Sequence, residues 1–319
     1  MVRRPVQAPR AVLEPVVGLA AAHTSVRATP AAAVSATRVE LLADLAVCAL
    51  VDEAELTPKP ALVDRRGSGA HDDMDLGMLR RSAHALRPTF AALAAQAHGR
   101  APSQQLREEL AAIGRRGERE MLAVTGGVNT HRGAIWTLGL LAAAASMAQL
   151  DAGPARVATL AGRVATFRDR YSPYETSHGS RVSRCYGVAG ARGEARRGFP
   201  HVVGVALPAL RGARAAGRSA QSARLDALVA LIISVDDTCL LHRGGRAALQ
   251  DAQTGARAVL AAGGSATVAG RRALRLLEAA LLRHNASPGG SADLLAGALL
   301  LDGLYNAAHG GENVPEEVA

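Results

Sequence analysis

Apolar residues recur at helical spacing along most of the chain. In the stretch 38–55 they lie three or four residues apart, as on the buried face of a helix. The same spacing predicts further helices over residues 74–97, 104–124, 155–170, 220–235, 247–260, 268–284 and 291–308. No stretch alternates apolar and polar residues for long enough to predict a strand. The pattern therefore predicts an all-α fold.

Prolines and glycines mark where these helices end. Pro58 and Pro60 stop the first helix, because the residue before a proline disfavours helical geometry. Pro88 is a candidate kink within 74–97. Gly126 and Gly127 end the helix 104–124 in the manner of a C-terminal cap.

The longest apolar stretch, residues 133–150, predicts a buried central helix that Asn129 or Thr130 caps. Its length is only marginal for a membrane span, and it is rich in alanine and contains polar residues. We therefore expect no membrane association.

Periodicity disappears between residues 172 and 208, a segment dense in Gly, Arg and His. A connection of this length is more typical of a functional or partly helical segment than of an inert loop. Composition shows no break after residue 38. We expect a single helical catalytic domain over 38–308 with glycine-rich functional loops between helices, a flexible N-terminal extension over 1–37 and a C-terminal tail over 309–319.

Composition narrows the class of ligand. Aromatic residues make up 3% of the chain, too few for a platform that stacks single-stranded nucleic acid. The net charge of +9 favours polyanionic partners, and every basic residue except Lys59 is arginine. These arginines are scattered rather than clustered, which favours small phosphorylated ligands over nucleic acid. A GC-rich genome would explain the arginine usage equally well.

The three cysteines, Cys48, Cys185 and Cys239, are widely spaced and form no CxxC pair. This arrangement fits neither a disulfide framework nor a zinc site. The N-terminus lacks the pattern of a secretory signal. We therefore expect a reduced, cytoplasmic protein.

Two acidic segments lie where loops meet apolar helices. If a helix begins near Asp72, then Asp72 and Asp75 lie one turn apart on one face and suit Mg²⁺. Acidic residues that stabilise a helix N-terminus are the alternative interpretation. Asp236 and Asp237 follow an apolar helix at its C-terminal end, where carboxylates are unfavourable without a cation.

Two glycine-rich segments also lead into apolar helices. Residues 126–133 could present backbone amides and Arg132 to a phosphate, although an ordinary glycine-capped corner fits as well. Residues 287–293 have the same character. The chain has no Walker A, GxSxG, HExxH or GxGxxG motif in the required context. In the segment 187–195, Glu194 beside Arg192 is a candidate base or substrate clamp, or equally a structural ion pair.

These segments resemble, in order, those of the triphosphoribosyl-dephospho-CoA synthase family. The resemblance spans roughly residues 40–305 and rests on six motifs: 59–64 (KPALVD), 69–75 (GAHDDMD), 126–135 (GGVNTHRGAI), 186–195 (YGVAGARGEA), 235–245 (VDDTCLLHRGG) and 287–295 (SPGGSADLL).

The resemblance implies a transferase that joins ATP to 3′-dephospho-CoA and releases adenine, with Mg²⁺ on the triphosphate. A ribose 2′-hydroxyl would attack C1 of the ATP ribose, and a holo-acyl carrier protein synthase would use the product. Segments 132–137 (RGAIWT) and 198–201 (GFPH) are closer to the malonate decarboxylase branch than to the citrate lyase branch. The sequence also leaves room for a homodimer.

On this basis we expect catalytic roles for Asp73, His131 and Glu194, and metal binding by Asp72, Asp75, Asp236 and Asp237. Substrate and phosphate contacts are expected from Lys59, Asp64, Arg65, His71, Gly126, Gly127, Asn129, Arg132, Arg192, His242, Arg243, Ser287, Gly289, Gly290 and Ser291.

Two other classes share some of these features. An ADP-ribosyl hydrolase-like enzyme would also use aspartate pairs and Mg²⁺, but with water as the acceptor. A nucleic-acid-binding protein would fit the positive charge and would bind DNA in a salt-dependent way. Neither accounts for six motifs in the family's order.

Overall fold

The computed structural model describes residues 30–149, 151–172 and 178–310, and the regular elements within them are helices joined by loops, with one isolated bridge between Asp64 and Gly67. This confirms the predicted all-α fold. The elements are α1 (Pro30–Glu55), α2 (Leu76–Ala85), α3 (Arg87–Ala97), α4 (Gln104–Val124), α5 (Arg132–Met147), α6 (Pro154–Thr166), α7 (His178–Tyr186), α8 (Gly190–Arg196), a π-helical turn η1 (Val202–Ala206), α9 (Leu207–Ala215), α10 (Ala220–Ser234), α11 (Thr238–Ala261), α12 (Val268–Arg283) and α13 (Gly289–Ala308).

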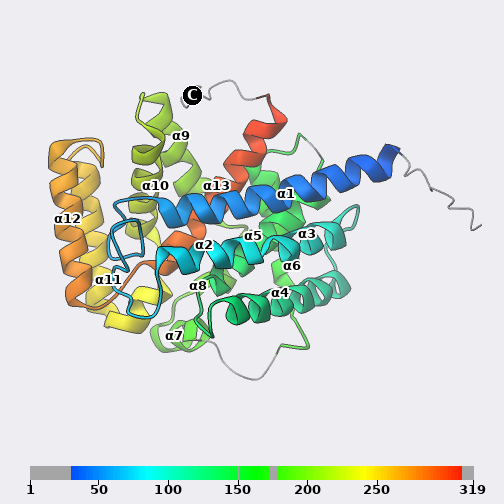
Figure 1. Ribbon diagram of the computed structural model, residues 1–319, viewed down its shortest axis with the longest axis horizontal. Helices are drawn as coiled ribbons and strands as arrows, with labels where there is room; N and C mark the ends of the chain where they lie inside the picture. The colour runs from blue at the N-terminus through cyan, green and yellow to red at the C-terminus, as the bar shows by residue number, and fades with distance from the viewer. Residues whose placement is uncertain (1–29, 150, 173–177, 311–319) are drawn as a thin grey trace, which may run out of the picture.

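Helix α5 lies at the centre of the fold. It packs against α1, α3, α6 and α13, and Figure 1 shows it behind α1 with the other helices around it. Its residues 137–146 are all buried, because a helix that is apolar on every side has no face for water. The predicted buried central helix is confirmed. Among the described residues, no helix is both long and apolar enough to cross a membrane.

The predicted helix 74–97 is two helices, α2 and α3, which meet at Leu86. Pro88 lies in the first turn of α3, where its missing N–H leaves no carbonyl unpaired. The first helix, in turn, begins at Pro30 rather than at residue 38. Residues 1–29 and 311–319, and so most of the predicted extension and tail, lie outside the described residues.

Residues 178–208 contain short helices rather than one long loop. Helices α7 and α8 are followed by η1, which passes directly into α9. Since Pro208 supplies no N–H to the carbonyl of Gly204, the α-helical register is interrupted at this point. The aperiodic segment is therefore partly helical, and its short elements explain why no long period was visible.

Helix α11 begins at Thr238, well before the predicted start at residue 247. Gly245, with φ 65° and ψ −159°, breaks it into two segments, and the sequence pattern revealed only the second. That second segment packs along α12, and the two helices lie side by side at one end of the molecule in Figure 1. The first segment carries His242 and Arg243 of the fifth motif.

Candidate active site

The Asp237 carboxylate joins the N-termini of two helices. Its Oδ1 accepts hydrogen bonds from the backbone N–H groups of Cys239 (2.9 Å) and Gly290 (3.2 Å). Its Oδ2 accepts from the N–H (2.8 Å) and the hydroxyl (2.9 Å) of Ser291. Asp237 is only 1% exposed. It therefore caps α11 and also holds the first turn of α13, so two motifs meet at one side chain.

This geometry corrects the premise that the acidic pair lies at an unfavourable helix C-terminus. Asp237 is the N-cap of the next helix, where its negative charge is favourable. Its oxygens are occupied by four donors, so they have little capacity left for a metal ion. Asp236, the other member of the pair, is exposed.

His71 connects the second motif to the fifth and sixth. Arg243 donates from Nη2 to His71 Nδ1 (3.0 Å), so Nδ1 is the acceptor and Nε2–H donates to the Ser287 hydroxyl (2.9 Å). Burial and the Arg243 charge lower the pKa of His71, which favours this neutral form. Arg243 also donates to the carbonyl of Ala70 (2.6 Å).

The first motif is held by hydrogen bonds and ion pairs, most of them to residues just before or after it. Lys59 is 1% exposed, and its ammonium donates to the Glu53 carboxylate and to the Glu53 carbonyl, both at 2.7 Å. Asp64 accepts from the Lys59 N–H (2.9 Å) and from Arg66, and Arg65 pairs with Glu55 at the surface. These three predicted substrate contacts thus already have protein partners.

The third and sixth motifs meet where α5 passes α13. The backbone of Gly133 lies against the Asp293 carboxylate, closer than any Cβ at residue 133 would allow. Burial and the nearby Glu53 and Asp237 charges raise the pKa of Asp293 well above its ordinary value. In the described part of the chain Asp293 has no hydrogen-bond or ion-pair partner. We did not single it out from the sequence as a site residue.

His131 lies deep in the same region. Its Nδ1 pairs with the Ser82 hydroxyl (2.7 Å), whereas its Nε2 is buried without a partner among the described residues. Burial and the neighbouring Lys59 charge lower the pKa of His131 to about 4, so the imidazole is neutral at physiological pH. A neutral, enclosed imidazole suits hydrogen bonding better than proton transfer with solvent.

The helix does not begin near Asp72, so Asp72 and Asp75 do not lie one turn apart on one helix face. Helix α2 begins at Leu76, and Asp75 is its N-cap, accepting from the Met78 N–H (2.7 Å). Asp72 and Asp73 lie in the preceding loop, both exposed, with the Asp73 carboxylate 3.7 Å from His71 Nδ1. The interpretation as helix-capping residues is confirmed for Asp75 alone.

The turn before α5 has the geometry expected of a glycine-rich corner. Gly126 and Gly127 have positive φ, and the Asn129 side chain accepts from the Arg132 N–H (3.2 Å). The Arg132 guanidinium pairs with Glu118. Arg132 therefore already has a carboxylate partner, which weakens the argument that it needs a bound anion.

Glu194 is buried and paired, but with His201 rather than with Arg192. It accepts from the His201 N–H (2.8 Å) and Nδ1–H (2.7 Å), while His201 Nε2–H donates to the Ser234 carbonyl (3.2 Å). The carboxylate raises the pKa of His201. This contact ties the fourth motif to the end of α10, next to Asp236.

Arg192 is exposed, as is His242, whose ring lies 4.5 Å from that of His178.

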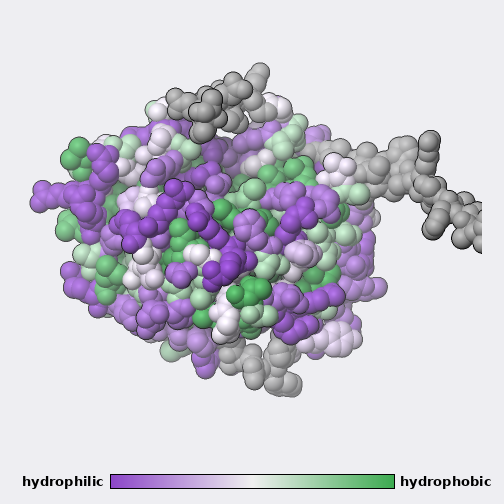
Figure 2. Space-filling view, in the orientation of Figure 1, coloured by the Kyte–Doolittle hydropathy of each residue, from purple (hydrophilic) through white to green (hydrophobic). Residues whose placement is uncertain are grey.

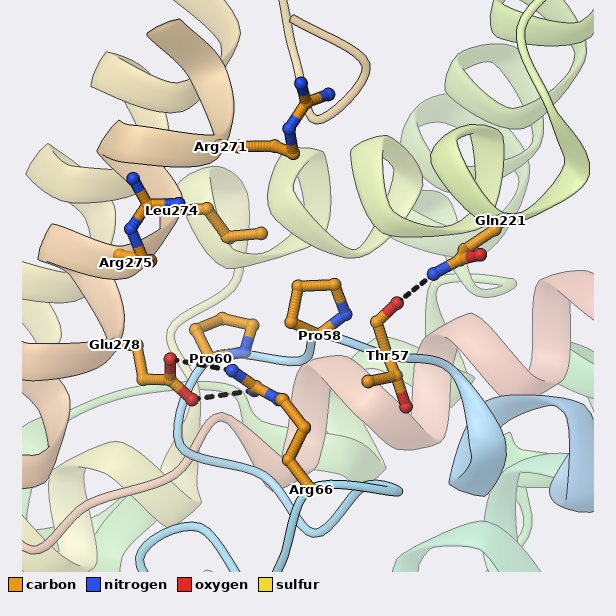
Figure 3. A pocket seen from close by; sticks show the side chains of 9 residues that line it. All are labelled: Thr57, Pro58, Pro60, Arg66, Gln221, Arg271, Leu274, Arg275 and Glu278. Carbon is orange, nitrogen blue, oxygen red and sulfur yellow. Dashed lines mark hydrogen bonds and ion pairs between the residues drawn. The ribbon is translucent and has the colours of Figure 1, made fainter. Parts of the chain in front are cut away.

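A surface cavity of about 310 Å³ lies beside the first motif, on the side of the loop that Pro58 and Pro60 face (Figure 3). Arg66 crosses its mouth to pair with Glu278 of α12. Of the motif residues, only Pro60 contributes to this cavity, so it lies at the margin of the site. Its lining residues are Thr57, Pro58, Pro60, Arg66, Gln221, Arg271, Leu274, Arg275 and Glu278.

Within the described ranges, no three His, Cys, Asp or Glu side chains are arranged to hold a metal ion. A divalent ion here would need substrate oxygens and water among its ligands, which is how Mg²⁺ is usually bound beside phosphates.

Figure 2 shows hydrophilic side chains over most of the visible face, with small apolar areas between them.

Comparisons with known proteins agree with the motif convergence. Residues 39–310 match the family described as CitG: ATP:dephospho-CoA triphosphoribosyl transferase. A protein of Azotobacter vinelandii named "Probable 2-(5''-triphosphoribosyl)-3'-dephosphocoenzyme-A synthase" is 58% identical over 267 residues, covering 83% of this chain and 91% of its own. A relative of the same name from Pseudomonas fluorescens is 57% identical over 265 residues, covering 82% and 91%. No solved structure matches the chain.

Proposed function

Because the chain belongs to the ATP:dephospho-CoA triphosphoribosyl transferase family, we propose that it forms the prosthetic-group precursor of the malonate decarboxylase acyl carrier protein. The family assigns the reaction itself: an ATP-using transferase that makes 2-(5''-triphosphoribosyl)-3'-dephospho-CoA from ATP and dephospho-CoA. The malonate branch is supported by the segments 132–137 and 198–201. The same reaction in the service of citrate lyase is the alternative.

The reaction sets three chemical demands. The 2′-hydroxyl of dephospho-CoA attacks C1 of the ATP ribose as the bond to N9 of adenine breaks, through a transition state with oxocarbenium character. The hydroxyl proton needs an acceptor, and departing adenine needs a proton. The phosphates need positive charge or hydrogen-bond donors.

We assign the proton acceptor to Asp293. Its carboxylate lies where the third and sixth motifs meet and has no protein partner in the described ranges, whereas Glu53 is paired with Lys59 and Asp237 with two helix N-termini. Burial and the Glu53 and Asp237 charges raise its pKa, so the Asp293 carboxylate is a stronger base than an ordinary aspartate. The proton that it takes from the 2′-hydroxyl can pass to adenine, so the step needs no net proton from solvent.

Asp72 and Asp73 are the residues that would hold Mg²⁺. Both are exposed, next to His71, and two carboxylates together with phosphate and water oxygens satisfy this ion. Asp75 and Asp237 fit the ion poorly, since their oxygens cap helices. Bound Mg²⁺ would neutralise charge on the triphosphate. His71, Arg243 and Ser287 form a rigid polar wall beside it, which would orient the substrate.

Adenine release is the decisive readout. The purified full-length protein, incubated with ATP, dephospho-CoA and Mg²⁺, should release adenine and form the triphosphoribosyl product in equal amounts, as measured by chromatography. Equal adenine release without dephospho-CoA would identify a nucleosidase and overturn the transferase assignment. Release of ADP-ribose from a modified protein would instead favour the ADP-ribosyl hydrolase alternative.

The downstream branch has its own test. The product is offered to purified holo-acyl carrier protein synthases together with the acyl carrier proteins of malonate decarboxylase or citrate lyase from one bacterium. The malonate assignment expects that a strain lacking this protein loses malonate decarboxylase activity and regains it when the product is supplied. Loss of citrate lyase activity alone would overturn it.

ATP and dephospho-CoA as substrates, with three free cysteines, also support a cytoplasmic location.

A further inference from the structure

Arg107 of α4 is a buried arginine that the motifs do not include. It is 8% exposed, and its guanidinium carbon lies 5.1 Å from the centre of the Trp136 ring. A guanidinium over an aromatic face gains a cation–π interaction. That interaction does not satisfy the N–H donors of the group.

The Arg107 guanidinium has no hydrogen-bond or ion-pair acceptor in the described part of the chain, and its Nε has neither a partner nor exposed surface. A buried charge without a partner is strongly unfavourable, and buried arginines are normally paired with carboxylates or phosphates. The Arg107 guanidinium is therefore suited to binding an anion.

The surroundings of Arg107 are cationic. Burial lowers the pKa of Arg107 most, the charges of Arg192, Arg115 and Arg196 lower it further, and the Asp169 carboxylate raises it. Asp169 is itself paired with Arg115. Arg192 is exposed and has no partner among the described residues. Positive charge thus exceeds negative charge here, as expected of a site for a multiply charged anion.

This arginine cluster adjoins the reacting centre. Trp136 follows Gly133 by three residues in α5, which is about one helical turn. Its indole N–H donates to the Ala191 carbonyl (3.1 Å) in α8, the helix that carries Arg192. Gly133 in turn lies against Asp293. The cluster therefore flanks the proposed position of the ribose.

We propose that Arg107, which lies over the Trp136 ring, and Arg192 of α8 bind an oligophosphate chain, namely the triphosphate of ATP. This assignment rests on the substrates of the proposed function. The triphosphate and the diphosphate of dephospho-CoA share the same chemistry, and the larger charge of the triphosphate matches the excess of arginines better. Kinetics with each substrate in turn separates the two sources.

Trp136 is the only tryptophan of the chain, so its fluorescence reports on this site directly. Inorganic triphosphate, titrated into the full-length protein, should change the emission in a saturable way. Arg107→Gln and Arg192→Gln should each weaken binding by about tenfold to a hundredfold, the loss of one charge-assisted hydrogen bond. Arg119→Gln, which removes an exposed arginine from the same helix, should leave binding unchanged.

In steady-state assays, both variants should raise KM for ATP far more than KM for dephospho-CoA. A rise confined to dephospho-CoA would overturn the assignment to ATP. Unchanged triphosphate affinity in both variants, with only a lower Tm for Arg107→Gln, would show that Arg107 merely packs on Trp136. Since Arg192 is exposed, Arg192→Gln tests the site even if Arg107→Gln fails to fold. Binding of inorganic triphosphate does not require turnover, so wild-type binding without adenine release would refute the proposed reaction and leave this site standing.

Discussion

Gly133 lies against the carboxylate of Asp293, and a larger residue at position 133 would displace that carboxylate. The contact joins α5 to α13 at the point where two motifs, separated by about half of the chain, come together. A glycine is required here by the close approach rather than by its backbone angles. The position of the proposed base therefore depends on the absence of a side chain.

Gly133→Ala should displace the Asp293 carboxylate and lower kcat by about a hundredfold, since a misplacement of the order of 1 Å can have that effect. The carboxylate is the mobile end of its side chain and can turn aside, while alanine favours the helix, so the free energy of unfolding should change by less than about 1 kcal/mol. Adenine release and chemical denaturation measure the two quantities.

Gly114→Ala is the matched control for this substitution. It places a methyl group on α4, where the added carbon would lie at an ordinary 3.9 Å from Ile135 of α5. It should leave both kcat and stability nearly unchanged. If Gly133→Ala retains full kcat, Asp293 is not the proton acceptor.

Asp237→Ala should lower the free energy of unfolding by about 2–3 kcal/mol. The substitution leaves the N–H groups of Cys239, Gly290 and Ser291 without their acceptor, and an unsatisfied buried donor costs about 1–3 kcal/mol. Asp236→Ala, at an exposed neighbour, should stay within about 0.5 kcal/mol of wild type. Urea denaturation compares them, and equal stability of the two variants would contradict the role of Asp237 as a shared cap.

His131 should make the protein sensitive to acid. Its pKa is about 4 in the fold and near the ordinary 6.5 when unfolded, so the unfolded chain binds the proton more readily. Stability should therefore fall as the pH is lowered from 6.5 towards 4, by about 3 kcal/mol in total at roughly 1.4 kcal/mol per pKa unit. Denaturation of wild type and His131→Gln across this range isolates the contribution. Parallel pH profiles would show that the imidazole is not sealed from solvent.

Asp72→Asn and Asp73→Asn should each raise the Mg²⁺ concentration needed for half-maximal adenine release, by about tenfold, because each removes a charged oxygen ligand. Chelation of Mg²⁺ should abolish turnover. Asp75→Asn should lower stability slightly through the α2 cap and leave the Mg²⁺ requirement unchanged. A shift of similar size in all three variants would point to general electrostatics rather than to ligation.

Helices with an unbroken apolar period could be predicted from the sequence almost to the residue. The ranges 104–124 and 268–284 correspond to α4 (Gln104–Val124) and α12 (Val268–Arg283). Where a glycine interrupts the period, the prediction failed. Gly245 hides the first segment of α11, because its non-helical backbone angles put a kink between two short helical segments and so interrupt the period.

The site could be predicted as a set of motifs, but the tasks of its residues could not. From the sequence, Asp237 is predicted to be a metal ligand. The structure shows instead that it accepts a hydrogen bond from Ser291, which lies 54 residues away. Arg107 lies on α4, where the sequence pattern predicts that charged residues face solvent. Its burial became apparent only from its packing against Trp136 of α5. Long-range contacts of this kind leave no periodic signal in the sequence.

The shared cap at Asp237 has a consequence for how charge is distributed in the site. Each helix N-terminus carries about half a positive charge, so the ends of α11 and α13 together balance the single carboxylate that they bind. The charge of Asp237 is thus largely balanced, and under the proposed triphosphate site the attraction for nucleotides would come from Arg107 and Arg192. Ionic strength should therefore weaken the capture of substrate, because salt screens charges over about 8–10 Å, while the bond-breaking step proceeds at the same rate in dilute and in concentrated buffer.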